Sequence, residues 1–163
     1  MVKLLLRQLQ HELQNHNIYR AFAGFYAHKG YSLLEKYYIM RADEELNHHR
    51  WIANYLNEYG IKYDYPDVPS IKIDFDDLLT PIEKTVDVEI ETTMLIYDMV
   101  DQAEKDHDYL TKSWLMGKDE KRGYLVIEQA EELSLSRAVL DVAKRGTPWE
   151  IKAETIMKMY QNS

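Results

Sequence analysis

Two glutamates precede two histidines in the stretch RADEELNHHRW, at residues 41–51. Within it, Glu45 and His48 are three residues apart, so in a helix their side chains lie about one turn apart and can reach the same point. A carboxylate and an imidazole that meet in this way are ligands for hard or borderline metal ions. The alternative interpretation is a solvated face of an ordinary amphipathic helix.

Carboxylates recur on the apolar faces of the segments around this stretch. Each of four predicted helices carries one near the middle of its apolar stripe: Glu12, Glu45, Glu89 and Glu132. A buried carboxylate costs several kcal/mol if it is ionised and unpaired, so four that converge need counter-charge. Lysine and arginine are scarce on these stripes, with Arg41 the visible exception. Two divalent cations bridged by a shared carboxylate would neutralise the four glutamates, and we therefore expect a metal site.

Helical periodicity and punctuation predict five helices, at about residues 3–28, 32–59, 80–110, 120–144 and 148–160. Gly30 and Gly60 are the expected stops of the first two. Three cap signals open later helices: Ser32 to Glu35, Thr80-Pro81-Ile82-Glu83 and Thr147-Pro148-Trp149-Glu150. The charged tract GKDEKRG at 117–123 indicates a break before the fourth helix.

Loop lengths fix how these helices can be arranged. A helix of 28 residues is about 42 Å long, and only a few residues join the first two, so these must be antiparallel. The connection at 61–79 is long enough to run the length of a bundle at about 3.3 Å per residue. The second and third helices can then be parallel. We expect an all-α four-helix bundle with one long crossover between helices two and three and a short fifth helix, as a single domain over 1–163.

Composition excludes several classes of protein. The formal net charge of -8 argues against nucleic acid as a partner and suits a protein that attracts cations. The chain has no cysteine, which excludes disulfides, thiolate zinc sites and cysteine nucleophiles and suits a reducing cytosol. The apolar run in MVKLLLRQLQHE is too short for a membrane span or a signal-peptide core. We expect a soluble cytoplasmic protein.

The set of candidate ligands resembles that of ferritin, whose fold is a bundle of this kind. In that family a glutamate comes from the first helix, E-x-x-H from the second, a glutamate from the third and Q-x-x-E from the fourth. This sequence has, in the same order, Glu12, Glu45 with His48, Glu89, and Gln129 with Glu132. Tyr19 stands one heptad after Glu12, as the family's tyrosine does. The likeness covers the first four helices, which are most of the chain.

The same residues distinguish this chain from related families. Bacterioferritins and rubrerythrins carry a second E-x-x-H on the fourth helix, where this sequence has Glu132. Leu46 follows Glu45 where bacterioferritins have the haem-ligating methionine, so no haem is expected. Dps proteins place their ligands differently. The pattern is that of a non-haem, prokaryotic-type ferritin.

The resemblance implies iron storage with ferroxidase activity, in which Fe(II) is oxidised by dioxygen or hydrogen peroxide at a di-iron centre. The first iron would bind Glu12, Glu45 and His48, and the second Glu45, Glu89 and Glu132. Gln129 would position an oxygen species or a water, and Tyr19 would donate an electron or orient a glutamate. A third iron would be bound by Glu44, Glu128 and Glu131. The family forms homo-oligomeric shells of twenty-four subunits, in which Fe(III) mineral is deposited.

Two alternatives stay open. The segment at 110–124 is longer than the family's connection between the third and fourth helices, which lines its three-fold channel, and this favours a di-iron oxidase or peroxidase that forms no cage. The other alternative is a bundle that binds metal without catalysis. His49 is a further departure, because an apolar residue is usual at that position near the apolar centre of the second helix.

Overall fold

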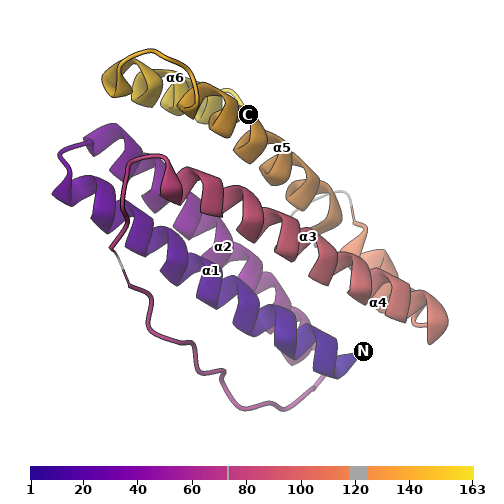
Figure 1. The fold of residues 1–163 in the computed structure, drawn as a ribbon. Helices are drawn as coiled ribbons and strands as arrows, with labels where there is room; N and C mark the ends of the chain where they lie inside the picture. The colour runs from indigo at the N-terminus through magenta and orange to yellow at the C-terminus, as the bar shows by residue number, and fades with distance from the viewer. Residues whose placement is uncertain (73, 118–124) are drawn as a thin grey trace.

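Helices make up all the regular structure in the computed structural model, which describes residues 1–72, 74–117 and 125–163 (Figure 1). The helices are α1 (Val2–His28), α2 (Ser32–Glu58), α3 (Thr80–Lys105), α4 (Tyr109–Leu115), α5 (Leu125–Ala143) and α6 (Trp149–Gln161). Figure 1 shows α1 antiparallel to α2, and α3 antiparallel to α5. These two pairs form the predicted all-α four-helix bundle, and α6 is the predicted short helix that follows it. No described helix is both long and apolar enough to cross a membrane.

The connection between α2 and α3 is extended and runs along the bundle, so that these two helices are parallel, as loop length predicted (Figure 1). It is attached at both ends. Near α2, the Nε2 atom of Gln10 donates to the backbone oxygen of Asp67 at 2.7 Å. Near α3, the ring of Phe75 packs edge-on against Phe22 and Phe25, with centroids 5.2 Å apart in each pair. The crossover therefore packs against α1.

Glycine ends the first two helices where the sequence predicted. Gly30 has φ of +81° and Gly60 has φ of +67°, in the left-handed region that side chains disfavour. The backbone N–H groups of the residues that follow, Tyr31 and Ile61, donate back to the last turn of each helix. Each chain reversal is therefore a local consequence of the sequence.

The predicted helix caps are wrong. Ser32 and Thr80 are already inside their helices and Thr147 lies outside, and the cap positions are occupied by Tyr31, Leu79 and Pro148 without any side-chain cap bond. At the start of α3, Asp77 serves instead, because its Oδ1 accepts from the backbone N–H groups of residues 79 and 80 at 2.8 Å each. A capping residue has non-helical backbone angles, so Ser32 and Thr80, which lie inside their helices, do not serve as caps.

The predicted end of the third helix, at about residue 110, is also wrong. The helix ends at Lys105, because His107 takes φ of +56° and reverses the chain. The separate helix α4 then begins, and the side chain of Asp108 caps it by accepting from the backbone N–H of Thr111 at 3.0 Å. The predicted start of the fourth helix near residue 120 and most of the break at 117–123 lie outside the described residues. The last helix occupies 149–161 instead of 148–160.

The core consists of two hydrophobic clusters separated by a polar layer. Along α1, Leu5 and Leu9 belong to one cluster and Tyr19 and Phe22 to the other. Along α2, the buried apolar residues before Arg41 belong to the cluster of Tyr19, and those after His49 belong to the cluster of Leu5. Most of the buried polar residues of both helices fall between the clusters. The middle of the bundle is therefore both dry and polar.

Candidate metal centre

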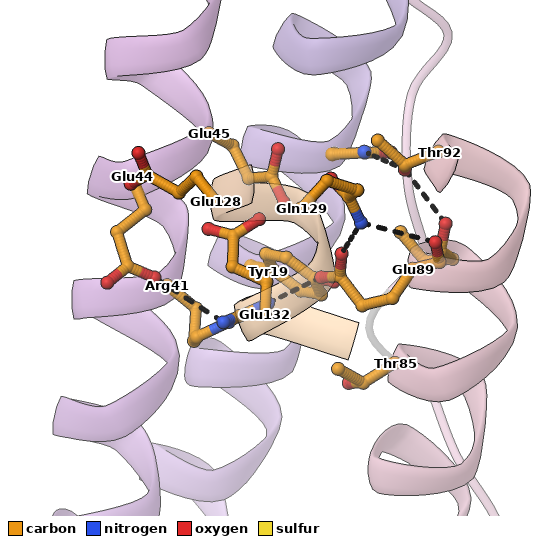
Figure 2. A network of polar contacts seen from close by, with 12 residues as sticks. Tyr19, Arg41, Glu44, Glu45, Thr85, Glu89, Thr92, Glu128, Gln129 and Glu132 are labelled. Atoms are coloured by element: carbon orange, nitrogen blue, oxygen red, sulfur yellow. Dashed lines mark hydrogen bonds and ion pairs between the residues drawn. The ribbon is translucent and has the colours of Figure 1, made fainter. Parts of the chain in front are cut away.

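All four long helices contribute side chains to this polar layer. The structure brings together the predicted ligands, which are at most 6% exposed: Glu12 on α1, Glu45 and His48 on α2, Glu89 on α3, and Gln129 and Glu132 on α5. Figure 2 shows Glu45, Glu89, Gln129 and Glu132 gathered at one point between the helices. Each lies on an apolar stripe, so burial of that stripe carries the polar group inward.

A first group of possible ligands consists of Glu12, Glu45 and His48, with one ligand atom of each within 4.8 Å of the others. The Nδ1 atom of His48 is 3.8 Å from Oε2 of Glu12 and 3.7 Å from Oε2 of Glu45. Gln8, four residues before Glu12, donates to the other oxygen of Glu12 at 2.6 Å. The glutamate is thus held through one oxygen while the second faces the imidazole.

A second group consists of Glu45, Glu89 and Glu132, again with one oxygen of each within 4.8 Å of the others. Glu45 belongs to both groups. A carboxylate has two oxygens, so this residue can bind one cation with each and bridge two ions.

A third group joins His48 and Glu132 to Glu128. The Nε2 atom of His48 is 3.5 Å from Oε1 of Glu128 and 3.8 Å from Oε1 of Glu132. This differs from the predicted set of Glu44, Glu128 and Glu131, of which only Glu128 enters a group among the described residues. Glu131 is exposed, because the residue beside Glu132 on a helix faces about 100° away.

Glu44, the remaining member of that predicted set, has other partners. Its Oε1 accepts a hydrogen bond from the phenol of Tyr160 on α6 at 2.5 Å. Its Oε2 lies 3.5 Å from Nη1 of Arg41. Glu44 and Glu131 nevertheless line the same surface pocket as Glu128 and Glu132, which brings acidic groups to the outer side of the layer.

Most of the candidate ligand atoms in the polar layer have no hydrogen-bond partner among the described residues. Among the described residues, the buried atoms without such a partner include Oε2 of Glu12, both carboxylate oxygens of Glu45 and of Glu132, and both ring nitrogens of His48. Buried polar groups are normally satisfied, and a cluster of exceptions calls for an explanation. Carboxylate oxygens with one imidazole are a donor set that suits Fe(II), Mn(II) or Zn(II). The residues fit a pair of divalent cations.

Burial and mutual charge shift the pKa values of this cluster strongly. Burial raises the pKa of Glu132 to about 8. Burial, with the charges of Glu12 and Glu89, also holds the pKa of Glu45 well above its usual range. Burial opposes the charged form of Glu12, but the neighbouring His48 outweighs it and lowers the pKa of that carboxyl to about 2. Without metal, these shifts favour the ionised form of Glu12 and the protonated forms of Glu45 and Glu132.

The carboxylates around His48 favour its protonated, positively charged form in the metal-free protein. Burial lowers the pKa of the imidazole, but the carboxylates of Glu132, Glu12 and Glu128 overcome this and raise it well above its ordinary value. The imidazole and the carboxyl groups must lose their protons before they can bind a cation. Cation binding at this centre is therefore coupled to proton release.

Glu89 differs from the other glutamates because its carboxylate is fully hydrogen-bonded. Oε1 accepts from the phenol of Tyr19 and from Nη2 of Arg41, and Oε2 accepts from Nε2 of Gln129 at 2.6 Å (Figure 2). The same Gln129 atom lies 3.2 Å from the backbone oxygen of Glu89. Tyr19 and Gln129, both predicted to assist the site, thus contact it through this one residue.

Three residues that contact the site were not predicted to do so from the sequence. Gln8 shares the stripe of Glu12 at a spacing of four, a signal that could have been used. Arg41 was noted for its position on the stripe, but its partner on α3 was not predicted. Tyr160 reaches Glu44 across 116 residues of sequence, and no local pattern announces such a contact.

His49 is buried for a structural reason. Its Nδ1 atom lies 2.8 Å from the backbone oxygen of Leu9, and its Nε2 atom meets the hydroxyl of Tyr65 in the crossover. The imidazole therefore connects α1, α2 and the crossover, and it belongs to none of the three groups of possible ligands among the described residues.

Comparison with known proteins gives consistent results. Residues 2–118 match the family model described as "Ferritin-like domain". A bacterial non-heme ferritin of Staphylococcus aureus is 30% identical over 135 residues, which cover 83% of this chain and 77% of that protein. The bacterial non-heme ferritin of Staphylococcus saprophyticus is 29% identical over 145 residues, covering 89% and 83%.

Solved structures share the fold. A humanized archaeal ferritin superposes with a TM-score of 0.87 at 20% identity, covering 98% of this chain and 94% of that one. The open-pore ferritin of Archaeoglobus fulgidus superposes with a TM-score of 0.81 at 21% identity, covering 96% and 94%.

Proposed function

We propose, from the premise that this chain belongs to the ferritin family, that it is an iron-storage ferritin that oxidises Fe(II) with dioxygen or hydrogen peroxide. The observation that carries the proposal is the set of buried carboxylate and imidazole atoms without hydrogen-bond partners where four helices meet. Iron is the substrate and the cargo in this function. No haem is needed.

The residues divide the binding of two Fe(II) ions between them. Glu12, Glu45 and His48 would hold the first ion through two oxygens and one nitrogen, and Glu45, Glu89 and Glu132 would hold the second through oxygens alone. Glu45 bridges the two. Each Fe(II) loses one electron, and dioxygen takes up the two electrons with two protons from solvent to give hydrogen peroxide. Carboxylates stabilise the higher charge of Fe(III), and the dry surroundings strengthen that effect.

Tyr19 and Gln129 act by holding Glu89. The phenol and the amide each donate a hydrogen bond to one of its oxygens. In addition, we assign to Gln129 the positioning of the oxidant or of a water, and to Tyr19 the donation of an electron. The pKa of Tyr19 is raised well above its ordinary value by burial and by the charge of Glu89, which keeps the phenol protonated.

Oxidised iron would leave through the acidic pocket on the outer side of the layer. This pocket has a volume of about 1090 Å³, large enough for hydrated ions, and Glu44, Glu128 and Glu131 line it beside Glu132. A third iron would bind here, with Glu128 as its innermost ligand because that residue lies nearest to His48. Glu44 and Glu131 would guide the ion outward.

Storage requires a shell of many copies of the chain. We assign to this protein a cytoplasmic homo-oligomer of twenty-four subunits, on the family resemblance. Large apolar side chains on the surface of α3 suit contacts between copies: Ile90, Met94 and Tyr97 are 38%, 63% and 49% exposed. Such a cluster on a monomer is typical of an interface.

Oxygen consumption after addition of Fe(II) tests the reaction. The wild-type protein is expected to consume dioxygen, and Glu45→Ala and Glu132→Ala are expected to lose this activity. Glu91→Ala is the matched control, because Glu91 is an exposed glutamate on α3. Wild-type rates in both site variants would refute the assignment of the centre.

Gel filtration with iron analysis tests storage. A shell of twenty-four chains of 19.4 kDa elutes at about half a megadalton and retains iron after aerobic loading. Fe(II) oxidation by a small species would instead identify a di-iron oxidase without a cage. Metal uptake without dioxygen consumption would identify a non-catalytic metal-binding bundle.

A further inference from the structure

Arg41 lies fully buried within the acidic layer, although the remainder of that layer is built to receive cations. It is the largest of the fully buried side chains and is 1% exposed. A buried guanidinium needs carboxylates around it, and Arg41 has two, although its Nε atom has no hydrogen-bond partner among the described residues. The charge of Arg41 is therefore part of the centre.

The guanidinium lies between a carboxylate of the second group of ligands and a carboxylate that lines the outer pocket. Its Nη2 atom is 2.5 Å from Oε1 of Glu89, a member of the second group of ligands. Its Nη1 atom is 3.5 Å from Oε2 of Glu44, which lines the outer pocket. The group also stacks over the ring of Tyr19, 5.5 Å from the ring centroid. Figure 2 shows Arg41 in this place, with Glu44 on one side and Glu89 on the other.

The first and second groups of ligands consequently differ before any cation arrives. In the first, Oε2 of Glu12 and Nδ1 of His48 have no hydrogen-bond partner. In the second, Glu89 already has donors on both oxygens, and one of them is a cation. A divalent ion that enters the first group has only to displace protons, because the neutral imidazole of His48 is itself a ligand, whereas in the second group it must compete for Glu89 with Arg41, whose guanidinium cannot lose its charge.

We propose that Arg41 is an internal counter-ion that binds Glu89 in place of the second metal ion and thereby makes occupancy of the two positions sequential. When a second cation arrives, Glu89 turns to it and the guanidinium shifts its contact to Glu44. Arg41 is then a positioning residue that sets the affinity of the second position while leaving the first unchanged. This inference rests on the proposed function, because it assumes that both groups bind divalent ions.

Zinc titration of the assembled, metal-free protein tests the inference without any redox reaction. Calorimetry on the wild type is expected to resolve a tight class of one ion per chain and a second class at least tenfold weaker. Arg41→Gln is expected to strengthen the second class tenfold or more and to change the first less than threefold. Arg41→Lys keeps the positive charge, so its second class should stay weak.

Arg7→Gln is the matched control, because Arg7 pairs with Asp98 at the surface, 3.4 Å away. It is expected to leave both classes unchanged. A purely structural role for Arg41 would lower the thermal stability of Arg41→Gln without strengthening the second class, and that result overturns the inference. The proposed function requires that the wild type binds zinc in a tight class and that Glu12→Ala abolishes this class. Failure of this requirement would overturn the proposed function instead.

A second measurement needs no variant at Arg41. Crystals of the wild type soaked with increasing zinc are expected to fill the Glu12, Glu45 and His48 group first. Arg41 should remain on Glu89 at low zinc and contact Glu44 once the second position is filled. Zinc in the second position with the contact between Arg41 and Glu89 intact would overturn the inference.

Discussion

The Nε2 atom of Gln129 on α5 lies 2.6 Å from Oε2 of Glu89 on α3 and donates a hydrogen bond to it inside the bundle. Gln129→Leu keeps the approximate volume and removes the donor. Loss of a hydrogen bond to a buried carboxylate is expected to lower the free energy of unfolding by about 1–3 kcal/mol. Chemical denaturation of the metal-free protein measures this loss.

Gln102→Leu provides the control for that measurement. Gln102 also donates to a carboxylate, that of Asp106 at 2.9 Å, but this pair is exposed. Its loss is expected to change the free energy of unfolding by less than about 0.5 kcal/mol. Equal losses in the two variants would mean that the buried contact between Gln129 and Glu89 contributes no more to the free energy of unfolding than the exposed one.

The stripe periodicity explains why the central residues could be selected from sequence. Glu12 lies between Leu9 and Tyr19 on α1, and Glu45 precedes Ile52 on α2, so each shares a face that has to be buried. Two helices joined by a short loop can only be antiparallel, and a long crossover permits a parallel third. These relations depend on spacing alone, which a sequence displays directly.

Contacts between distant segments could not be predicted in this way. The partner of Arg41 is on α3, and the partner of His49 is in the crossover, so both depend on how the elements pack. Even the local cap signals were misleading: Asp77 accepts from the backbone N–H groups of residues 79 and 80, and those of 82 and 83, for which Thr80 was the expected acceptor, donate to the backbone oxygen of Leu79. The break at His107 likewise depends on a single backbone angle that no motif announces.

Raising the pH is expected to destabilise the metal-free protein. The pKa of Glu132 is about 8 when folded against an ordinary value of 4.5, so between these values the folded state holds a proton that the unfolded state has lost. This contribution is fully present below about pH 4.5 and is lost as the pH rises through 8. Each such proton costs about 1.4 kcal/mol of stability per pH unit. The raised pKa values of Glu45 and His48 act in the same direction.

Denaturation in the presence of a chelator at pH 6, 7 and 8 measures this slope. Glu132→Gln is expected to reduce it, because the amide does not titrate. Glu131→Gln, at the exposed neighbouring position, should keep the wild-type slope. Stability that is constant or that increases over this range would contradict the proton assignments at the centre.

Zinc binding is expected to release protons and to strengthen as the pH rises. The raised pKa values of His48 and Glu45 favour their protonated forms in the metal-free protein, and both groups must lose these protons to become ligands. Glu12, whose pKa is about 2, is already ionised and needs no such step. Titration calorimetry in buffers with different enthalpies of protonation gives the number of protons released per ion, which should be at least one near pH 6.5. Identical heats in all buffers would exclude this coupling.

Tyr19→Phe is expected to lower the stability of the protein and its rate of Fe(II) oxidation without changing zinc affinity at the first position. The phenol donates to Oε1 of Glu89, and its removal leaves Arg41 as the only donor to that oxygen among the described residues. The free energy of unfolding should fall by about 1–2 kcal/mol, and Fe(II) oxidation should slow because Glu89 is less well oriented. Zinc affinity at the first position should stay within threefold, since the Tyr19 hydroxyl donates to Glu89 and, in the described part of the chain, makes no hydrogen bond to Glu12 or His48. Tyr97→Phe, at a residue 49% exposed, is the control and should alter none of these. A loss of first-position affinity equal to the loss in oxidation rate would show that the tyrosine supports the whole centre and not Glu89 alone.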